Sequence, residues 1–258
     1  MIASVPLVVF SDLDGTLLDH DTYSWAAARP AIAALAEIGA VLVLASSKTA
    51  PEIEVLQQQM GVQGQPAIVE NGAGLIGIGE QAAADYPALR QALEDVPDRA
   101  LFEGFGDMDA VGVAGATGLD PQAAVLARKR SFSEPGVWHG TPQQEAAFIS
   151  TLAARGIAAR RGGRFLTLSF GRTKADGMAD IMAHIGPAPT LALGDAPNDA
   201  EMLEAAENGV IIHNPHSAPL PRLAGETTGR ISRTLDAGPI GWNKAVLARV
   251  ELLNCSKD

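Results

Sequence analysis

The chain has 258 residues, of which 47% are hydrophobic and 19% are charged. This length and composition are typical of a globular protein with one large or two modest hydrophobic cores, and they exclude a disordered chain. The formal net charge is −11. A charge of that sign repels nucleic acid and anionic lipid, so we expect neither as a partner. It also repels a phosphorylated substrate, unless a bound cation and local Lys or Arg residues reverse the field at the site.

A single cysteine, Cys255, excludes an intramolecular disulfide and fits a reducing compartment. No apolar run approaches the length needed to cross a bilayer, and the N-terminus lacks the basic region and cleavage site of a secretory signal. We therefore expect a cytoplasmic protein that has no membrane partner and is a monomer or a small homo-oligomer.

The first part of the chain alternates between strand and helix patterns. Short apolar runs predict buried strands at Leu7–Phe10, Val41–Ala45 and Ala67–Val69. Between them, apolar spacing predicts a helix over Arg29–Ile38, and a capping box that begins at Thr49 predicts a second helix. Strands and helices in this alternation indicate a parallel sheet with right-handed crossovers.

The segment from 81 to 170 loses this regularity. A helix is predicted over Leu119–Arg130, and a second capping box at Thr141 opens another helix. The segments Ile157–Arg161 and Arg164–Phe170 flank Gly162-Gly163, which has the composition of a hairpin turn, so we predict that they pair. The alternation then returns, with predicted elements at Ala175–Ile185, Thr190–Leu193, Asp199–Ala206, Gly209–Ile212 and Lys244–Leu253. We therefore predict an α/β protein whose parallel-sheet core comprises residues 1–80 and 171–258, with an α+β cap domain inserted at residues 81–170.

Polar groups follow four of the predicted parallel strands, at the carboxyl ends where open α/β sheets bind their ligands. These groups are Asp12 with Asp14, Ser46 to Lys48, Glu70 to Gly72 (with Asn71 at its centre), and Gly194 to Asp199 (with Asp195 and Asn198). Because the carboxyl ends of parallel strands meet at one edge of a sheet, the convergence of four groups is stronger evidence for a site than any single group.

The carboxylates in these groups require a counterion. Asp12, Asp14, Asp195 and Asp199 would repel one another if brought together alone, and a hard divalent cation such as Mg²⁺, which prefers oxygen ligands, resolves that conflict. An Asp in such a loop can instead cap a helix or tighten a turn, and for Asp199 this alternative stays open.

Two carboxylates two positions apart can also have different catalytic roles. Asp12 beside Mg²⁺ can attack phosphorus, while Asp14 protonates the leaving alcohol and then deprotonates the attacking water. Ser46 can donate a hydrogen bond to a phosphoryl oxygen. Lys174 stands at a predicted helix start, where its charge suits the dipole poorly, so it could serve an anion. A solvated surface position is the alternative for Lys174 and for Lys48.

The motif Phe10–Thr16, followed by Ser46, Lys174 and Gly194–Asp199, resembles the four motifs of the haloacid dehalogenase superfamily of phosphatases. The resemblance implies a Rossmann-like core and a large cap inserted between the second and third motifs. It also implies that Asp12 is the nucleophile and that Asp14 is the general acid and base.

The same resemblance implies where the metal and the phosphoryl group bind. Mg²⁺ would be held by the side chain of Asp12, the backbone carbonyl of Asp14 and Asp195, with Asn198 and Asp199 orienting the metal site. Ser46 and Lys174 would contact the phosphoryl group.

A narrower resemblance concerns the substrate. The segments Ser46–Thr49, Arg128–Pro135, Gly163–Phe165 and Gly238–Asn243 are similar to segments of mannosyl-3-phosphoglycerate phosphatases. That similarity implies a substrate with a glycerate carboxylate as well as a phosphate, for which Arg130 and Arg164 would be bidentate partners. The alternatives are a solvated helix end for Arg130 and a position beside a hairpin turn for Arg164.

Three further residues complete the candidate substrate-binding set. Glu134 could accept hydrogen bonds from sugar hydroxyls, and Lys48 and Asn71 lie in the strand-end groups. Thr167 departs from the pattern, since this position is expected to hold His in mannosyl-3-phosphoglycerate phosphatases.

The sequence thus predicts a Mg²⁺-dependent phosphatase that acts through an aspartyl-phosphate on a small glycosylated phosphoglycerate, with mannosyl-3-phosphoglycerate as the expected substrate. A phosphatase or phosphomutase for another sugar phosphate is one alternative. A phospho-receiver signalling domain is another, although a receiver carries its phosphoacceptor after the third strand, where this chain offers Glu70 and Asn71, and has no need of a cap.

Overall fold

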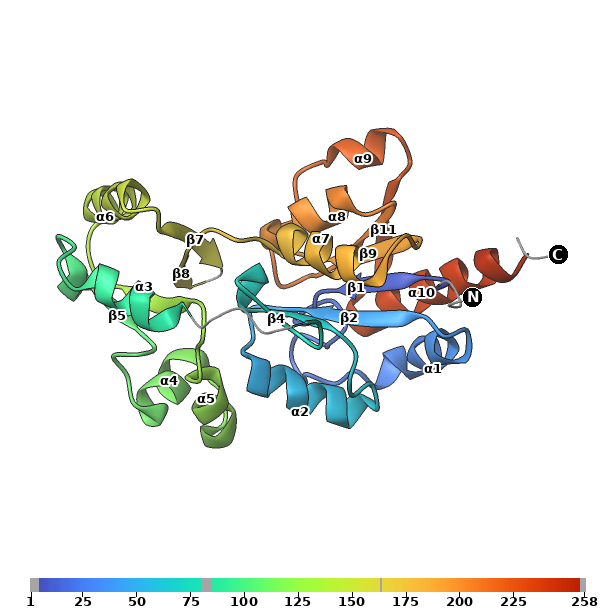
Figure 1. The fold of residues 1–258 in the computed structure, drawn as a ribbon, viewed down its shortest axis with the longest axis horizontal. Coiled ribbons are helices and arrows are strands. Elements are labelled where there is room, and N and C mark those ends of the chain that lie inside the picture. Colours follow the sequence, from blue (N-terminus) through green and yellow to red (C-terminus); the bar gives the residue numbers. More distant parts are fainter. Residues whose placement is uncertain (1–4, 80–84, 163, 256–258) are drawn as a thin grey trace.

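The computed structural model describes residues 5–79, 85–162 and 164–255 and contains two separate sheets, each covered by its own helices (Figure 1). The larger sheet has seven strands in the order β11-β10-β9-β1-β2-β3-β4. Their bounds are β1 Val8–Ser11, β2 Val41–Ala45, β3 Ala67–Val69, β4 Gly74–Ile76, β9 Thr190–Gly194, β10 Asn208–His213 and β11 Ile231–Ala237. All neighbouring pairs are parallel except β3 and β4. The expected Rossmann-like parallel core is therefore confirmed.

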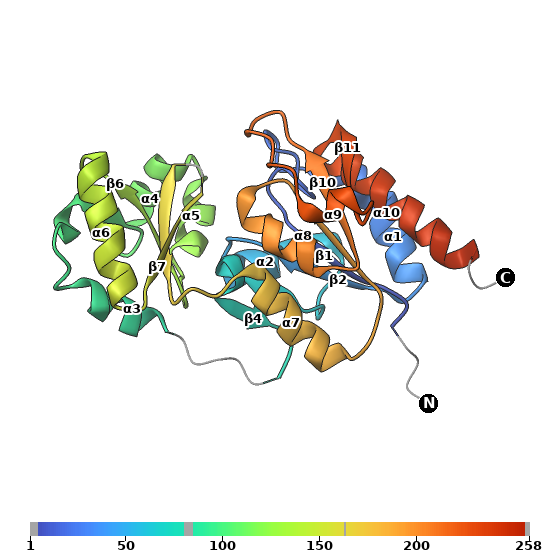
Figure 2. The ribbon, with the colours of Figure 1, turned by 90° about the horizontal axis from the view of Figure 1, so that it is seen from above.

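Helices cover both faces of this sheet (Figure 2). One face carries α1 (Arg29–Glu37), α2 (Ala50–Met60) and α10 (Gly238–Cys255), and the other carries α7 (Lys174–Ile185) and α8 (Ala200–Ala205), with the short α9 (Ala224–Thr227) nearby. On β1, Val9 packs into the first layer, whereas Val8 and Phe10 pack into the second. Since successive side chains of a strand point to opposite faces, a strand covered on both faces is apolar throughout.

Capping residues set the starts of the helices nearest the strand ends. Thr49 accepts a hydrogen bond from the backbone of Glu52, and the Glu52 carboxylate accepts one from the backbone of Thr49, as the capping box at α2 predicts. Thr173 and Asp176 form the same reciprocal pair at α7. Lys174 is consequently the first residue of α7, and its side chain begins at the edge of the sheet where the strand-end groups meet.

The second sheet is antiparallel and has the strand order β5-β6-β8-β7. Its strands are β5 Phe102–Gly104, β6 Glu134–Trp138, β7 Ala158–Gly162 and β8 Phe165–Ser169. Helices α3 (Tyr86–Leu93) and α6 (Pro142–Ala154) pack on one face, and α4 (Ala110–Thr117) and α5 (Pro121–Ala127) on the other. The predicted pairing of β7 with β8 is confirmed, although Gly163 of its turn lies outside the described residues.

Two of the predicted helices differ from the structure by three residues or more at one end. Helix α5 ends at Ala127 instead of Arg130, and the next residues run toward the larger sheet. Helix α10 begins at Gly238 instead of Lys244, because Pro239 is tolerated within a first helical turn.

All four strands of the antiparallel sheet fall within residues 81–170. The expected border at 80–81 lies outside the described residues, so the domain limits remain a prediction. In the described part of the chain, no helix is long and apolar enough to cross a membrane.

Trp242 joins α10 to the loop that follows β1. Its side chain is fully buried, and its indole N–H donates to the Ser11 hydroxyl at 2.8 Å. We expect Trp242→Ala to lower the free energy of unfolding by about 3–5 kcal/mol, measured by urea denaturation, because it leaves a large cavity. Leu235→Ala, at a side chain that is 95% exposed, should cost about 0.5 kcal/mol or less. Equal losses in the two variants would contradict this description of the core.

Candidate active site

A cavity of about 410 Å³ lies between the carboxyl ends of the parallel strands and the antiparallel sheet. Asp12, Asp14 and Asn71 line it from the core, and Phe165 and Thr167 line it from β8 of the cap. The strand-end groups that the sequence predicts to converge therefore share one cavity, and the cap closes its opposite side.

Lys174 forms the buried centre of the site. Its ammonium nitrogen lies 2.5 Å from an oxygen of Asp12 and 2.7 Å from an oxygen of Asp199. Burial, and after it the neighbouring Asp199, raise the pKa of Asp12 well above its usual range, and Lys174 opposes that effect. Burial alone would lower the pKa of Lys174, but Asp12 and Asp199 raise it above its usual value. The surface alternative for Lys174 is therefore wrong, since only 1% of its side chain is exposed.

Three carboxylates are placed to share one metal ion. Oxygens of Asp12, Asp195 and Asp199 all lie within 4.8 Å of one another, and all three residues are buried. Lys174 supplies one positive charge against three carboxylates, so the group has an excess of negative charge that a hard divalent cation would neutralise. The donor set therefore fits Mg²⁺.

Two residues that the sequence did not single out hold Asp195 in position. The Thr16 hydroxyl donates to one oxygen of Asp195 at 2.7 Å, and the Asn214 amide donates to the other at 2.7 Å. Burial raises the pKa of Asp195, and the bond from Asn214 opposes that rise. Such partners orient a ligand carboxylate for a metal.

The sequence left two roles open for Asp199, a member of the carboxylate group or a residue that caps a helix or tightens a turn, and the structure combines them. One oxygen contacts Lys174, while the other accepts hydrogen bonds from the backbone of Asp195 at 3.1 Å and of Ala196 at 3.0 Å. A Cβ at Gly194 would lie 2.5 Å from the Asp199 side chain, so this close approach requires glycine. Asp199 therefore shapes the loop and also contributes charge to the carboxylate group.

Asp14 points away from this carboxylate group. Both of its oxygens accept hydrogen bonds from the Lys48 ammonium, at 2.9 and 2.8 Å, and 38% of its side chain is exposed to the cavity region. Burial would lower the pKa of Lys48, but Asp14 raises it. The metal role expected for Asp14 concerns its backbone carbonyl and remains a prediction. The surface alternative for Lys48 does not hold, because its ammonium is paired at the site.

Ser46 and Asn71 lie in adjacent loops of the core. Ser46 is buried at the end of β2, where its hydroxyl accepts a hydrogen bond from the Lys48 backbone at 3.2 Å and its carbonyl accepts one from the Asn71 backbone at 2.9 Å. The Asn198 side chain donates to the Asn71 side chain at 3.1 Å, which ties the third strand-end group to the fourth. Asn71 and Asn198 both line the cavity.

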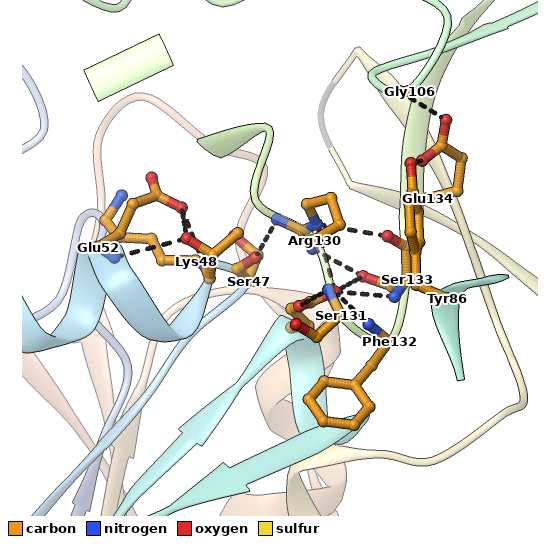
Figure 3. A network of polar contacts seen from close by, with 12 residues as sticks. Ser47, Lys48, Glu52, Tyr86, Gly106, Arg130, Ser131, Phe132, Ser133 and Glu134 are labelled. Carbon is orange, nitrogen blue, oxygen red and sulfur yellow. Dashed lines mark hydrogen bonds and ion pairs between the residues drawn. The ribbon is translucent and has the colours of Figure 1, made fainter. Parts of the chain in front are cut away.

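The cap candidates differ in where their side chains lie. Arg130 and Arg164 line the cavity, and Arg164 also donates to the Thr117 carbonyl at 2.7 Å. Glu134 is fully buried inside the cap, where its carboxylate accepts hydrogen bonds from the Tyr86 hydroxyl at 2.5 Å and the Gly106 backbone at 2.9 Å (Figure 3). It also accepts one from Arg90 at 2.8 Å. Glu134 is not among the residues that line the cavity. Its expected contact with sugar hydroxyls does not fit this position.

Positive charge predominates around the cavity, in contrast to the whole chain. Among the described residues, its cationic side chains are Lys48, Arg130, Arg160, Arg161, Arg164, Arg172 and Lys174, and its acidic ones are Asp12, Asp14, Glu52 and Glu70. Seven cations against four acids meet the requirement that a phosphate site imposes on a protein of net charge −11. The sequence did not single out Arg160, Arg161 or Arg172, because an Arg on an exposed strand or linker resembles an ordinary surface residue.

The metal assignment can be tested by calorimetric titration with MgCl₂. We expect one site, with affinity lowered about 10–100-fold or more in Asp195→Asn, because that change removes a candidate ligand. Asp107→Asn is the control, since Asp107 pairs with Arg90 and Arg99 inside the cap, and it should leave the affinity unchanged. Equal affinity of Asp195→Asn and the wild type would contradict the assignment.

Comparisons with known proteins agree with this architecture. The chain is similar in structure to a Thermoplasma acidophilum protein, with 17% identity, coverage of 96% of this chain and 99% of that one, and a TM-score of 0.70. It is also similar to the sucrose-phosphatase of Synechocystis sp. PCC6803, solved with sucrose and phosphate, with 17% identity, coverage of 96% and 98%, and a TM-score of 0.67. A phosphatase of the haloalkanoate superfamily from Bacteroides thetaiotaomicron shares 20% identity, with coverage of 97% of each chain and a TM-score of 0.67.

These structural similarities establish the fold, and the sequence itself establishes the family. The family model of haloacid dehalogenase-like hydrolases matches residues 9–93 and 161–220, which together exceed half of the chain. Both matched segments contain members of the buried carboxylate group, Asp12 in the first and Asp195 and Asp199 in the second. The chain belongs to the haloacid dehalogenase-like hydrolases.

Proposed function

We propose that the protein is a Mg²⁺-dependent phosphatase that transfers a phosphoryl group to Asp12 and acts on a small phosphate ester carrying a sugar and a second acidic group. The observation that carries this proposal is the buried group of Asp12, Lys174 and Asp199, which lies beneath a cavity whose charged side chains are mainly cationic. Such a site combines a nucleophile with a fixed positive charge for the phosphoryl oxygens.

Each residue has a chemical task in the proposed reaction. Asp12 attacks phosphorus and becomes an aspartyl-phosphate, while the alcohol leaves with a proton from Asp14. Asp14 then accepts a proton from the water that hydrolyses the aspartyl-phosphate, which releases phosphate and restores Asp12. Lys174 and Ser46 bind the phosphoryl oxygens. When bound by Asp12, Asp195 and Asp199, Mg²⁺ supplies charge neutralisation between the nucleophile and the phosphate.

The pairing of Asp14 with Lys48 adds a condition to this reaction. Both oxygens of Asp14 accept hydrogen bonds from the Lys48 ammonium, so Asp14 must separate from Lys48 before it can contact the leaving oxygen of a substrate. A substrate whose second acidic group attracts Lys48 would favour that separation. The proposed second acidic group therefore matches the core of the site as well as the cap.

Three observations support the proposed substrate class: the residues that line the cavity, a sequence resemblance and a structural similarity. Arg164 offers its guanidinium group to a carboxylate or phosphate that reaches the cap. Its neighbours on β7, Arg160 and Arg161, also line the cavity, where they pair with Glu201 and Glu145. The sequence segments around Ser46 and Arg130 resemble mannosyl-3-phosphoglycerate phosphatases, and a protein of the same fold was solved with sucrose and phosphate. We propose mannosyl-3-phosphoglycerate, which would give mannosylglycerate and phosphate, as the first substrate to test.

The test is a phosphate-release screen with the purified full-length protein, run with MgCl₂ and with EDTA. The panel should contain mannosyl-3-phosphoglycerate and its glucosyl analogue, together with 3-phosphoglycerate, hexose 6-phosphates and phosphoserine. We expect release that requires Mg²⁺, with the highest kcat/KM for an ester that carries both a sugar and a carboxylate. An absence of Mg²⁺-dependent release from every ester would refute the phosphatase, and a neutral hexose phosphate as the best substrate would refute the second acidic group.

A phosphomutase with the same nucleophile would return the phosphoryl group to a sugar. Incubation with ³²P-labelled hexose phosphate and a second, unlabelled sugar phosphate separates the two reactions. We expect the label in inorganic phosphate. Label that accumulates in the second sugar phosphate would favour the mutase.

A further inference from the structure

One segment of the cap docks on the core beside the active site. After α5 the chain runs through Arg130 to Ser133 before it enters β6, and Figure 3 shows this segment next to Ser47 and Lys48 of the core. Phe132 packs into the hydrophobic cluster of the core, although its neighbours in the sequence belong to the cap. A Cβ at Gly74 would lie 2.2 Å from the Phe132 ring, so β4 leaves space for this ring by having glycine there.

Glu70 of the core binds this segment through its side chain. Its carboxylate accepts hydrogen bonds from three successive backbone N–H groups, those of Ser131 at 2.8 Å, Phe132 at 3.2 Å and Ser133 at 2.7 Å. The Ser133 hydroxyl adds a fourth bond at 2.7 Å. Glu70 is 2% exposed. A buried carboxylate with so many donors stabilises one arrangement of cap and core and disfavours others, because separating them would leave its charge without partners.

Arg130 connects the same contact to the cavity. Its Nε lies 3.2 Å from a Glu70 oxygen, and both side chains are buried. Its two terminal nitrogens donate to the Ser133 hydroxyl at 2.6 Å and to the Ser47 carbonyl at 3.1 Å. Since Ser47 lies between Ser46 and Lys48, Arg130 bridges the cap segment, Glu70 and the catalytic loop of the core while it lines the cavity.

The backbone at Glu70 is also held in an uncommon conformation. Glu70 and Asn71 have φ values of +50° and +60°, in the left-handed region that residues other than glycine rarely adopt. In that conformation the Glu70 N–H donates to the Lys48 carbonyl, and the Asn71 N–H donates to the Ser46 carbonyl, both at 2.9 Å. The side chain of Glu70 thus binds the cap, while its backbone N–H binds the loop that carries Ser46 and Lys48.

We infer that Glu70 is a positioning residue, which acts through Arg130 and the Arg130–Ser133 segment to fix the substrate-facing side of the cap over the catalytic loop. This assigns Arg130 to the junction between cap and core, so the cap side chains left to meet a second acidic group are those of Arg164, Arg160 and Arg161. A second ion pair between the two parts, Arg160 with Glu201, is 3.4 Å long and about half exposed, and such pairs contribute little to stability.

The first test measures the position of the cap without any substrate. Spin labels at Val111 of the cap and Leu235 of the core, both well exposed, report the distance between the two parts in a Cys255→Ser background. We expect a single narrow distance distribution for the wild type and a broader one for Glu70→Gln and for Arg130→Met. Glu70→Gln keeps the shape of the side chain, removes its charge and replaces one of its two acceptor oxygens by a donor amide. Glu103→Gln, which alters an exposed pair with His139, is the matched control and should keep the narrow distribution.

The second test measures the consequence for binding, and it rests on the proposed phosphatase activity. Inorganic phosphate and 3-phosphoglycerate are compared as competitive inhibitors of p-nitrophenyl phosphate hydrolysis. Phosphate needs only the core, whereas 3-phosphoglycerate also presents a carboxylate to the cap. In Glu70→Gln and Arg130→Met, we expect the Ki of 3-phosphoglycerate to rise about tenfold while that of phosphate stays within about twofold. The double variant should be no worse than either single variant, because both changes break one contact.

The two tests fail in different ways. If neither the wild type nor any variant hydrolyses the substrate, the proposed phosphatase activity is refuted. The distance measurement then still tests whether Glu70 positions the cap. Distance distributions that are equally narrow in the wild type, Glu70→Gln and Arg130→Met overturn the inference. A lower melting temperature with an unchanged ratio of the two Ki values also overturns it, since Glu70 would then have a purely structural role.

Discussion

Asp12→Asn should abolish Mg²⁺-dependent phosphate release, with kcat lowered by about 10³-fold or more. Asparagine keeps the size of the side chain, but its amide oxygen is a far weaker nucleophile than a carboxylate. The substitution also removes one of the three carboxylates that would hold Mg²⁺. Phosphate release from the best ester of the screen, followed at saturating MgCl₂, measures the effect. Turnover within tenfold of the wild type would refute Asp12 as the nucleophile.

The same variant should be as stable as the wild type or more stable when Mg²⁺ is absent. Burial and Asp199 raise the pKa of Asp12 in the folded protein. The folded state therefore disfavours the ionised carboxylate, and at neutral pH this charge lowers the stability of the fold. Urea unfolding in EDTA compares the two proteins. Asp21→Asn is a matched control for activity, because Asp21 is an exposed residue whose side chain lies 3.5 Å from His216, and it should keep full turnover.

Lys174→Met should be the most destabilising change at the site. The side chain is buried between Asp12 and Asp199, so its removal leaves two buried carboxylates without their cation. Breaking a buried ion pair from one side costs about 3–5 kcal/mol, and urea unfolding in EDTA should show a loss of that size. MgCl₂ should recover part of the loss, because a divalent cation neutralises the same carboxylates. Phosphate release should remain strongly reduced even when the fold is restored.

Lys244→Met provides the comparison for this prediction. Lys244 pairs with Asp236 on the surface, where both side chains are well exposed, so the variant should lose less than about 1 kcal/mol and should not respond to Mg²⁺. If Lys174→Met lost as little, or if MgCl₂ restored none of its stability, the carboxylates would not depend on Lys174 or the metal for neutralisation.

The core could be predicted closely because its signals are local. The strand Val41–Ala45 is apolar at every position, and Thr49 and Thr141 mark helix starts by capping boxes that the structure confirms. Strands β4, β5, β6 and β11 escaped prediction for physical reasons. Strands β4 and β5 have three residues each, which is too short for a period to be visible. Strand β6 contains Pro135 and Gly136, which weaken a strand pattern, and β11 is largely exposed, so its sequence carries no buried apolar run.

The site was predictable to the extent that strand order alone determines it. Four polar groups at strand ends had to meet, and this placed Asp12, Asp195 and Asp199 correctly near one another. Contacts between distant segments were not predictable in that way. Thr16 is 179 residues from its hydrogen-bond partner Asp195. Glu70 accepts hydrogen bonds from the segment after α5, and the path of that segment depends on where α5 ends. The candidate site roles themselves await the experiments above.

The contrast between a cationic cavity and an acidic chain also bears on how molecules of different size approach the site. Electrostatic forces in physiological salt fall off over roughly 8 Å. A small anionic ester inside the cavity therefore experiences mainly the seven cations that surround it. A polynucleotide or a phosphorylated protein that reached the same cavity would extend beyond it. Its remaining negative charges would be repelled by the acidic surface of the protein. If the proposed activity holds, we expect the cavity and the outer surface together to favour small phosphate esters over large phosphorylated molecules, and raised salt to weaken this preference.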